Sequence, residues 1–90
     1  MKEYIIKQDF KLRQIGENYI VVALGKESKR FNGMINLNST GAFMWKKIDE
    51  VHTKEALIKA VMEEYEVEEA IASADIDGFL KVLEDNGIFE

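Results

Sequence analysis

The chain has 90 residues, 47% hydrophobic and 32% charged, a length and balance typical of one globular domain with a single core. It contains no cysteine, which excludes disulfides, thiolate metal sites and a cysteine nucleophile. The 12 basic and 17 acidic side chains give a net charge of −5, which opposes binding to a phosphate backbone. From the length we expect one domain over residues 1–90, and from the charge we expect no nucleic-acid partner.

The N-terminal residues 1–14 carry charged side chains throughout the stretch that a signal peptide would need to be apolar. No stretch approaches the about 20 consecutive apolar residues of a membrane-spanning helix. We therefore expect a cytoplasmic protein without a membrane partner.

Two stretches rich in β-branched and aromatic residues, 12–15 and 19–24, flank Gly16, Glu17 and Asn18. Because glycine and asparagine tolerate the positive φ angles of short turns, the pattern predicts a β-hairpin. Downstream we expect a polar loop over residues 25–30, then a turn over residues 31–33, and a third short strand over residues 34–37. The role of the basic loop segment 26–30 is left open, between contact with phosphate or an acidic partner and simple solvation.

The hydrophobic period becomes helical after Asn38. The spacing i, i+3, i+4, i+7 is occupied by Gly41, Met44, Trp45 and Ile48. This predicts a helix over residues 39–49, with Asn38 or Ser39 as its N-cap. We interpret Trp45 as a core residue rather than as a platform for a ligand.

Two further helices are predicted. The second begins after the capping residue Thr53, and its apolar stripe consists of Leu57, Ile58, Val61 and Tyr65. The third runs over residues 68–86 and ends before Gly87. Its core stripe consists of Ala72, Ile76, Phe79 and Leu83.

This order of elements indicates an α+β domain, similar to a winged-helix arrangement, in which a three-stranded antiparallel sheet is followed by three helices. A sheet of three strands keeps at least one edge uncovered unless a helix packs over it. The fold class therefore already directs attention to a free strand edge.

The sequence contains no pattern that predicts catalysis or a cofactor. His52, the only histidine, lies between two predicted helices and is interpreted as a solvent-facing linker residue. The run 63–69 has five carboxylates in seven residues but lacks the spacing of a calcium loop. No glycine-rich phosphate loop occurs. We expect a protein that is not an enzyme and holds neither metal nor cofactor.

The charge is distributed unevenly along the chain. Residues 1–62 carry 11 basic and 7 acidic side chains, and residues 63–90 carry 1 and 10. A helix that reads the major groove of DNA presents basic or amide side chains, whereas the third predicted helix is acidic. A winged-helix transcriptional regulator therefore remains only the alternative function.

A free strand edge beside a helix can bind an extended peptide, which gains main-chain hydrogen bonds from the strand and specificity from pockets. The third helix has a side stripe outside its core stripe, consisting of Ile71, Asp75, Gly78 and Val82. Gly78 costs about 1 kcal/mol relative to alanine within a helix and often indicates close approach of another group. The alternative, that Ile71 and Val82 widen the core stripe, is left open.

Four segments resemble a known family. Residues 35–45 (INLNSTGAFMW) resemble the signature LNxTGAxIW of the PqqD-like proteins, named for pyrroloquinoline quinone biosynthesis protein D. Residues 53–58, 64–67 and 79–88 resemble the family's second-helix opening, its eeYdV segment and its FLxxLxxxGLI ending. The resemblance covers about residues 12–89, with Met44 at a position where isoleucine is more usual.

The resemblance implies a peptide chaperone, called a RiPP recognition element, that binds the leader of a ribosomally synthesised precursor peptide. Such domains present the leader to a modifying enzyme, commonly of the radical SAM type. In the family the leader adds to the third strand and lies against the third helix. The corresponding positions here are Met34, Ile35, Asn36 and Leu37 on the strand and Ile71, Asp75, Gly78 and Val82 on the helix.

Three points stay open from the sequence: which precursor is bound, which enzyme receives it, and whether the exposed edge also supports a homodimer.

Overall fold

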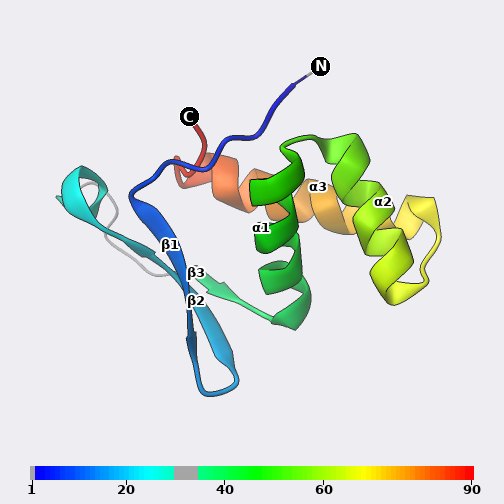
Figure 1. Ribbon diagram of the computed structural model, residues 1–90, viewed down its shortest axis with the longest axis horizontal. Coiled ribbons are helices and arrows are strands. Elements are labelled where there is room, and N and C mark those ends of the chain that lie inside the picture. The colour runs from blue at the N-terminus through cyan, green and yellow to red at the C-terminus, as the bar shows by residue number, and fades with distance from the viewer. Residues whose placement is uncertain (1, 30–34) are drawn as a thin grey trace.

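The computed structural model describes residues 2–29 and 35–90 and contains three strands and three α-helices. In chain order these are β1 (Phe10–Ile15), β2 (Asn18–Ala23), β3 (Ile35–Leu37), α1 (Ser39–Val51), α2 (Lys54–Tyr65) and α3 (Glu69–Asp85), with a short 3₁₀ helix, η1 (Gly25–Lys29), after β2 (Figure 1). The strands form one antiparallel sheet in the order β1-β2-β3. The predicted α+β architecture, a three-stranded antiparallel sheet followed by three helices, is confirmed.

The predicted hairpin forms with a turn of two residues. Gly16 has a φ of 62°, a conformation that glycine adopts without steric cost, and Gln14 Nε2 donates to its carbonyl oxygen at 3.1 Å. Asn18, which we expected in the turn, is instead the first residue of β2 and pairs with Ile15. The shorter turn suits the twist of an antiparallel pair.

The chain after β2 differs from the predicted loop. Strand β2 ends at Ala23, since Gly25 has a φ of 58° and Ser28 Oγ donates to its carbonyl at 2.7 Å, closing the 3₁₀ turn of η1. Local hydrogen bonds of this kind compete with extended structure. The turn predicted over residues 31–33 lies outside the described residues.

Helix α1 crosses one face of the sheet and begins at the capping residue Asn38, whose side-chain oxygen accepts from the N–H of Gly41 at 2.8 Å. The face predicted to be apolar is buried and includes Trp45, which is 5% exposed. A Cβ atom on Gly41 would lie 3.2 Å from Cβ of Leu37, closer than such contacts ordinarily come. Glycine at this position therefore lets α1 approach β3.

Replacing the cap tests the start of α1. We expect Asn38→Ala to lower the free energy of unfolding by about 1 kcal/mol, because the N–H of Gly41 loses its acceptor. Urea denaturation followed by circular dichroism measures the change. Asn38→Asp keeps an acceptor and should unfold near the wild-type midpoint, and equal loss in both variants would contradict the assignment of the cap.

Helices α2 and α3 bury most of the predicted stripes. Thr53 caps α2 through its hydroxyl, which accepts from the N–H of Ala56 at 3.3 Å. The core stripe of α3 is buried throughout, and Gly87 beyond it has a φ of 70°. One expectation is wrong: Tyr65, at the end of α2, is 38% exposed and meets the Phe43 ring edge-on, with a centroid distance of 5.5 Å.

The N-terminal segment, for which no element was predicted, is part of the core. Tyr4 and Ile6 are buried, and Ile6 forms a β-bridge with Phe89 near the other end of the chain. The N–H of Tyr4 donates to the carbonyl of His52 at 2.6 Å. Both termini consequently lie close together, as Figure 1 shows. No helix in the described ranges is long and apolar enough to span a membrane.

Candidate functional site

The sheet has two outer strands, β1 and β3, and the hydrogen-bond pattern shows which backbone groups face away from it. In an antiparallel pair, alternate residues direct both N–H and C=O toward the partner strand, and the residues between them direct theirs away. The N–H of Leu24 donates to the carbonyl of Asp9 at 2.7 Å, which sets this alternation for the ladder between β1 and β2. Leu12 and Gln14 of β1 therefore face away from β2.

The same alternation applies to β3. Tyr19 and Val21 of β2 direct their backbone groups toward β3, where they pair with Leu37 and Ile35. Asn36, between these two, consequently directs its N–H and C=O away from the sheet. It is the residue of β3 that offers a free donor and acceptor to an added strand.

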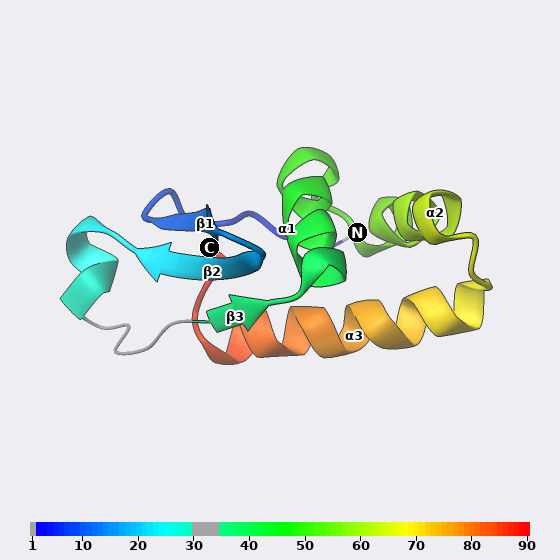
Figure 2. The same cartoon turned by 90° about the horizontal axis from the view of Figure 1, so that it is seen from below.

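The free edge of β3 opens onto a groove whose other wall is α3. Figure 2 shows β3 lying above the C-terminal half of α3. The groove has a volume of about 270 Å³ and is lined by Ile35, Asn36, Leu37, Asn38, Met44, Gly78, Phe79 and Val82. A short strand and a long helix far apart in sequence thus form the two sides of one open channel.

The groove brings together five of the eight residues predicted to bind peptide. Ile35, Asn36 and Leu37 form one wall, and Gly78 and Val82 form the other. Met34 lies outside the described residues.

The other two predicted residues lie on the same face of α3 but beyond the groove. Asp75 is one helical turn before Gly78, and Ile71 is another turn before Asp75. Both are exposed and neither lines the groove. The helical stripe is therefore longer than the strand that faces it.

The groove also contains three residues that sequence reasoning did not include. Met44 and Phe79 are 5% and 8% exposed and form an apolar floor, and Asn38 closes one end. Both apolar residues were correctly predicted to be core residues. Their second role depends on the gap between β3 and α3, for which the sequence pattern carries no signal.

The side stripe of α3 is not part of the core. Ile71 is 52% exposed and Val82 is 46% exposed, which contradicts the alternative in which they widen the core stripe. Outside the neighbouring backbone of α3, a Cβ atom on Gly78 would meet no atom within 4 Å in the described part of the chain. Gly78 therefore leaves open space in the wall of the groove.

The acidic charges of α3 are partly neutralised. Lys54 of α2 contacts Asp77 at 2.5 Å, and Lys81 contacts Asp85 at 3.3 Å. The hydrogen bond that Lys54 donates to the Asp77 carboxylate raises the pKa of Lys54. Asp75 has no ion pair within the described part of the chain. Among the described residues, Asp75 is therefore the acidic member of the side stripe that has no ion pair, and it lies on α3 beyond the groove.

His52 is not the simple solvent-facing linker residue that we expected. It ends α1 with a φ of 63°, and its buried Nδ1 atom has no hydrogen-bond partner among the described residues. The carbonyl of the same residue accepts from Tyr4, which explains why the tip of this loop is held against the N-terminal segment. Over the described ranges, no three histidine or acidic residues are grouped so that they could hold a metal ion.

The chain matches one family model and resembles two solved structures. The model described as "Coenzyme PQQ synthesis protein D (PqqD)" matches residues 19–88. The structure described as "TbiB1 in Complex with the TbiA(beta) Leader Peptide" has a TM-score of 0.75 and 21% identity, and the match covers 100% of this chain and 95% of that one.

The second structure, described as "Lasso peptide synthetase B1 complexed with the leader peptide", has a TM-score of 0.75 and 22% identity, with 96% and 95% of the two chains covered. At these identities the two structures show a shared fold. No curated protein matches the chain.

Proposed function

Because the chain belongs to the family of coenzyme PQQ synthesis protein D, we propose that it binds the leader of a ribosomally synthesised precursor peptide and presents it to a modifying enzyme. This role requires no catalytic side chain in the chain itself. We further propose that the reaction takes place in the cytoplasm and that the enzyme is of the radical SAM type, as in many members of the family.

The observation that carries this proposal is the free edge of β3 facing an open, partly apolar groove. Asn36 directs its N–H and C=O into the space that an added strand would occupy. Main-chain hydrogen bonds to such an edge supply affinity for any extended peptide, and side-chain pockets supply selectivity. Both similar structures are complexes with leader peptides, which supports leader binding as the function of this chain.

Three properties of the groove define the peptide that we propose. Met44 and Phe79 on its floor accept an apolar side chain of the leader. Gly78 leaves room for the peptide backbone to approach α3. Asp75 and Ile71 extend the proposed contact along α3 beyond the groove. The full proposed surface is the one predicted from the sequence, Met34 included, with Asn38, Met44 and Phe79 added.

A DNA-binding role receives no comparable support. The helix that would enter the major groove carries Glu69, Asp75, Asp77, Glu84 and Asp85 against the single base Lys81, and acidic side chains repel phosphates.

Direct binding tests the proposal. The leader of the precursor peptide encoded beside this chain is titrated into ¹⁵N-labelled protein, and we expect saturable amide shifts at Asn36 and over residues 75–82. Absence of shifts at both places, for a leader that the modifying enzyme requires, would reject the proposal.

A proline in β3 separates strand addition from other modes of binding. The N–H of Asn36 faces away from β2, so we expect Asn36→Pro to keep the sheet, as edge strands tolerate proline. It should weaken leader binding about tenfold through loss of one main-chain hydrogen bond. Isothermal titration calorimetry measures the affinity. Asn36→Ala retains the N–H and is the matched control, and equal affinities of the two variants would exclude pairing at this residue.

A further inference from the structure

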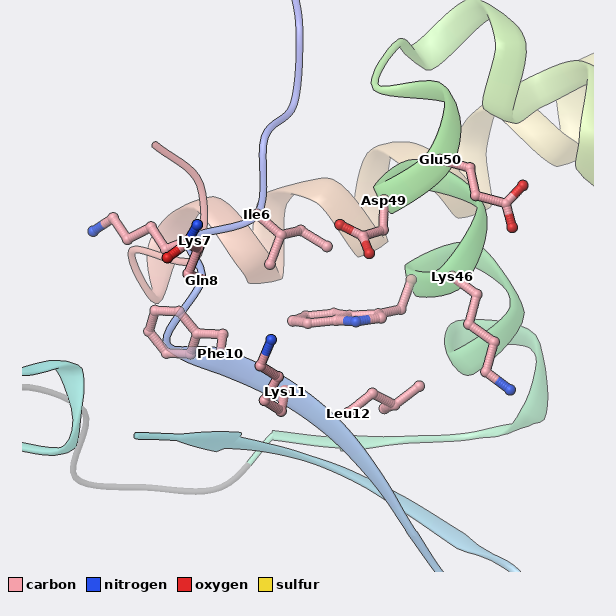
Figure 3. Close-up of a pocket in the computed structure, with 10 residues that line it drawn as sticks. Ile6, Lys7, Gln8, Phe10, Lys11, Leu12, Lys46, Asp49 and Glu50 are labelled. Carbon is pink, nitrogen blue, oxygen red and sulfur yellow. The ribbon is translucent and has the colours of Figure 1, made fainter. Parts of the chain in front are cut away.

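The opposite edge of the sheet also opens onto a cavity, and the leader-binding proposal makes no use of it. This cavity has a volume of about 550 Å³ and lies between β1, α1 and the N-terminal segment (Figure 3). Leu12, Ile6 and Trp45 give it an apolar surface. Figure 3 shows that Asp49 points from α1 toward Ile6 across this space, whereas Lys46 and Glu50 point away.

The backbone of β1 is available beside the cavity. Leu12 and Gln14 direct their N–H and C=O groups away from β2. Neither residue has another backbone hydrogen bond in the described part of the chain. The edge therefore offers two donors and two acceptors next to an apolar surface, which is the arrangement that binds an added strand.

The side chains of β1 set the charge of a segment that could pair with it. Lys11 and Arg13 are exposed, alternate with the half-buried Leu12, and have no ion pair within the described ranges. The nearby Lys7, in contrast, is already paired with Glu27 at 3.7 Å. An added strand with acidic residues opposite Lys11 and Arg13 would gain two cross-strand ion pairs.

The apolar lining of the cavity restricts where the acidic residues of the added strand can lie. The Asp49 carboxylate faces the cavity from α1, and Lys7, Lys11 and Lys46 line the same cavity, so its charges largely offset one another. The cavity side, which faces Leu12 and Trp45, therefore favours apolar side chains. The expected pattern is an alternation of acidic and apolar residues.

A second copy of the chain fits this edge poorly. Antiparallel pairing of β1 with itself would bring Lys11 and Arg13 beside the same residues of the other copy, and like charges on neighbouring strands destabilise a sheet. Lysine on an edge strand commonly prevents such pairing. The charge of β1 therefore favours a different protein as the partner.

We propose that β1 and the adjacent cavity form a second docking surface, which binds an extended segment of a partner protein in which acidic and apolar residues alternate. This surface is independent of leader binding, because β2 separates it from the groove at β3. Both edges can be occupied at once, so the sheet can hold a peptide on one side and a partner protein on the other.

The test uses an acetylated and amidated hexapeptide that alternates glutamate and leucine, titrated into the full ¹⁵N-labelled chain. We expect saturable shifts at the amides of residues 11–14 and at the indole N–H of Trp45, with Asn36 and Gly78 unchanged. The same peptide with lysine in place of glutamate should bind about tenfold more weakly, because it meets Lys11 and Arg13 with like charge. No shifts, shifts at Asn36 and Gly78 instead, or equal binding of both peptides would overturn the proposal.

Variants of β1 identify the charge and backbone contributions separately. Lys11→Glu combined with Arg13→Glu should reverse the preference between the two peptides. Gln14→Pro removes an outward N–H and should weaken the glutamate peptide, whereas Gln14→Ala, which keeps it, should not. If the double variant fails to fold, the comparison of Gln14→Pro with Gln14→Ala tests the proposal by itself.

Self-association in sedimentation velocity that Gln14→Pro abolishes would assign the edge to a second copy and overturn the proposal. Because the leader titration is read at Asn36 and Gly78, failure at β1 leaves that result unaffected.

Discussion

Gly78→Leu should reduce leader binding about 10- to 100-fold while leaving the fold intact, the loss expected when a side chain overfills a packed contact. Among the described residues outside the neighbouring backbone of α3, a Cβ atom at this position meets nothing within 4 Å, so the new side chain occupies the groove without displacing the core. Leucine also has a higher helix propensity than glycine, which stabilises α3 by roughly 1 kcal/mol. The variant should therefore melt at or above the wild-type temperature and yet bind the leader weakly.

Gly78→Ala is the matched control for this prediction. Alanine gives a similar gain in helix propensity but adds a single methyl group to the groove, so its binding loss should be smaller than that of leucine. Calorimetric titration of the leader and thermal melting of each variant provide the two readouts. A Gly78→Leu variant that binds with wild-type affinity would show that the peptide does not contact this face of α3.

Trp45→Ala should lower the free energy of unfolding by about 3 to 5 kcal/mol, the usual cost of removing a large buried aromatic side chain. Trp45 is 5% exposed and belongs to the same core cluster as Ile48 and Leu83. Because domains of this size are stable by only about 5 to 15 kcal/mol, the variant should be partly unfolded near body temperature. Urea denaturation followed by far-ultraviolet circular dichroism measures the loss.

Leu24→Ala provides the comparison, since Leu24 is 43% exposed and exposed substitutions usually change stability by no more than about 0.5 kcal/mol. A loss below about 1 kcal/mol for Trp45→Ala would contradict the interpretation of Trp45 as a core residue.

The two proposed binding surfaces share one supporting helix. Met44 forms part of the floor of the groove at β3, and Trp45, the next residue, lines the cavity at β1. Successive residues of a helix point in directions about 100° apart, so α1 can reach toward both edges of a narrow three-stranded sheet. Residues 35–45, which carry the family signature, therefore contain β3 and the part of α1 that supports both proposed surfaces.

The resemblance to the family placed the proposed leader edge at residues 34–37, of which Ile35 to Leu37 form β3 at an edge of the sheet. The length of the groove was not predictable in the same way. The stripe on α3 continues to Asp75 and Ile71, whereas β3 contains only three residues. How far α3 extends beyond β3 depends on the place and angle at which the two elements cross.

Local interactions explain what the sequence by itself determined. The hairpin turn, the helix starts and the core stripes depend on neighbours within about four residues. Gly16 therefore specifies the turn, and Asn38 and Thr53 specify the helix caps, independently of how the elements pack against one another. The family resemblance, too, rests on short segments of this kind. These features gave the fold class and the core residue Trp45 correctly.

The tertiary structure alone decided which distant residues share a surface. Tyr4 and Ile6 enter the core because Phe89 and the carbonyl of His52 meet them, and Phe79 forms the groove floor because β3 passes over it. The cavity at β1 likewise exists only after α1 has crossed the sheet. Each of these contacts joins segments separated by at least 33 residues, and sequence periodicity carries no information about packing at such a distance.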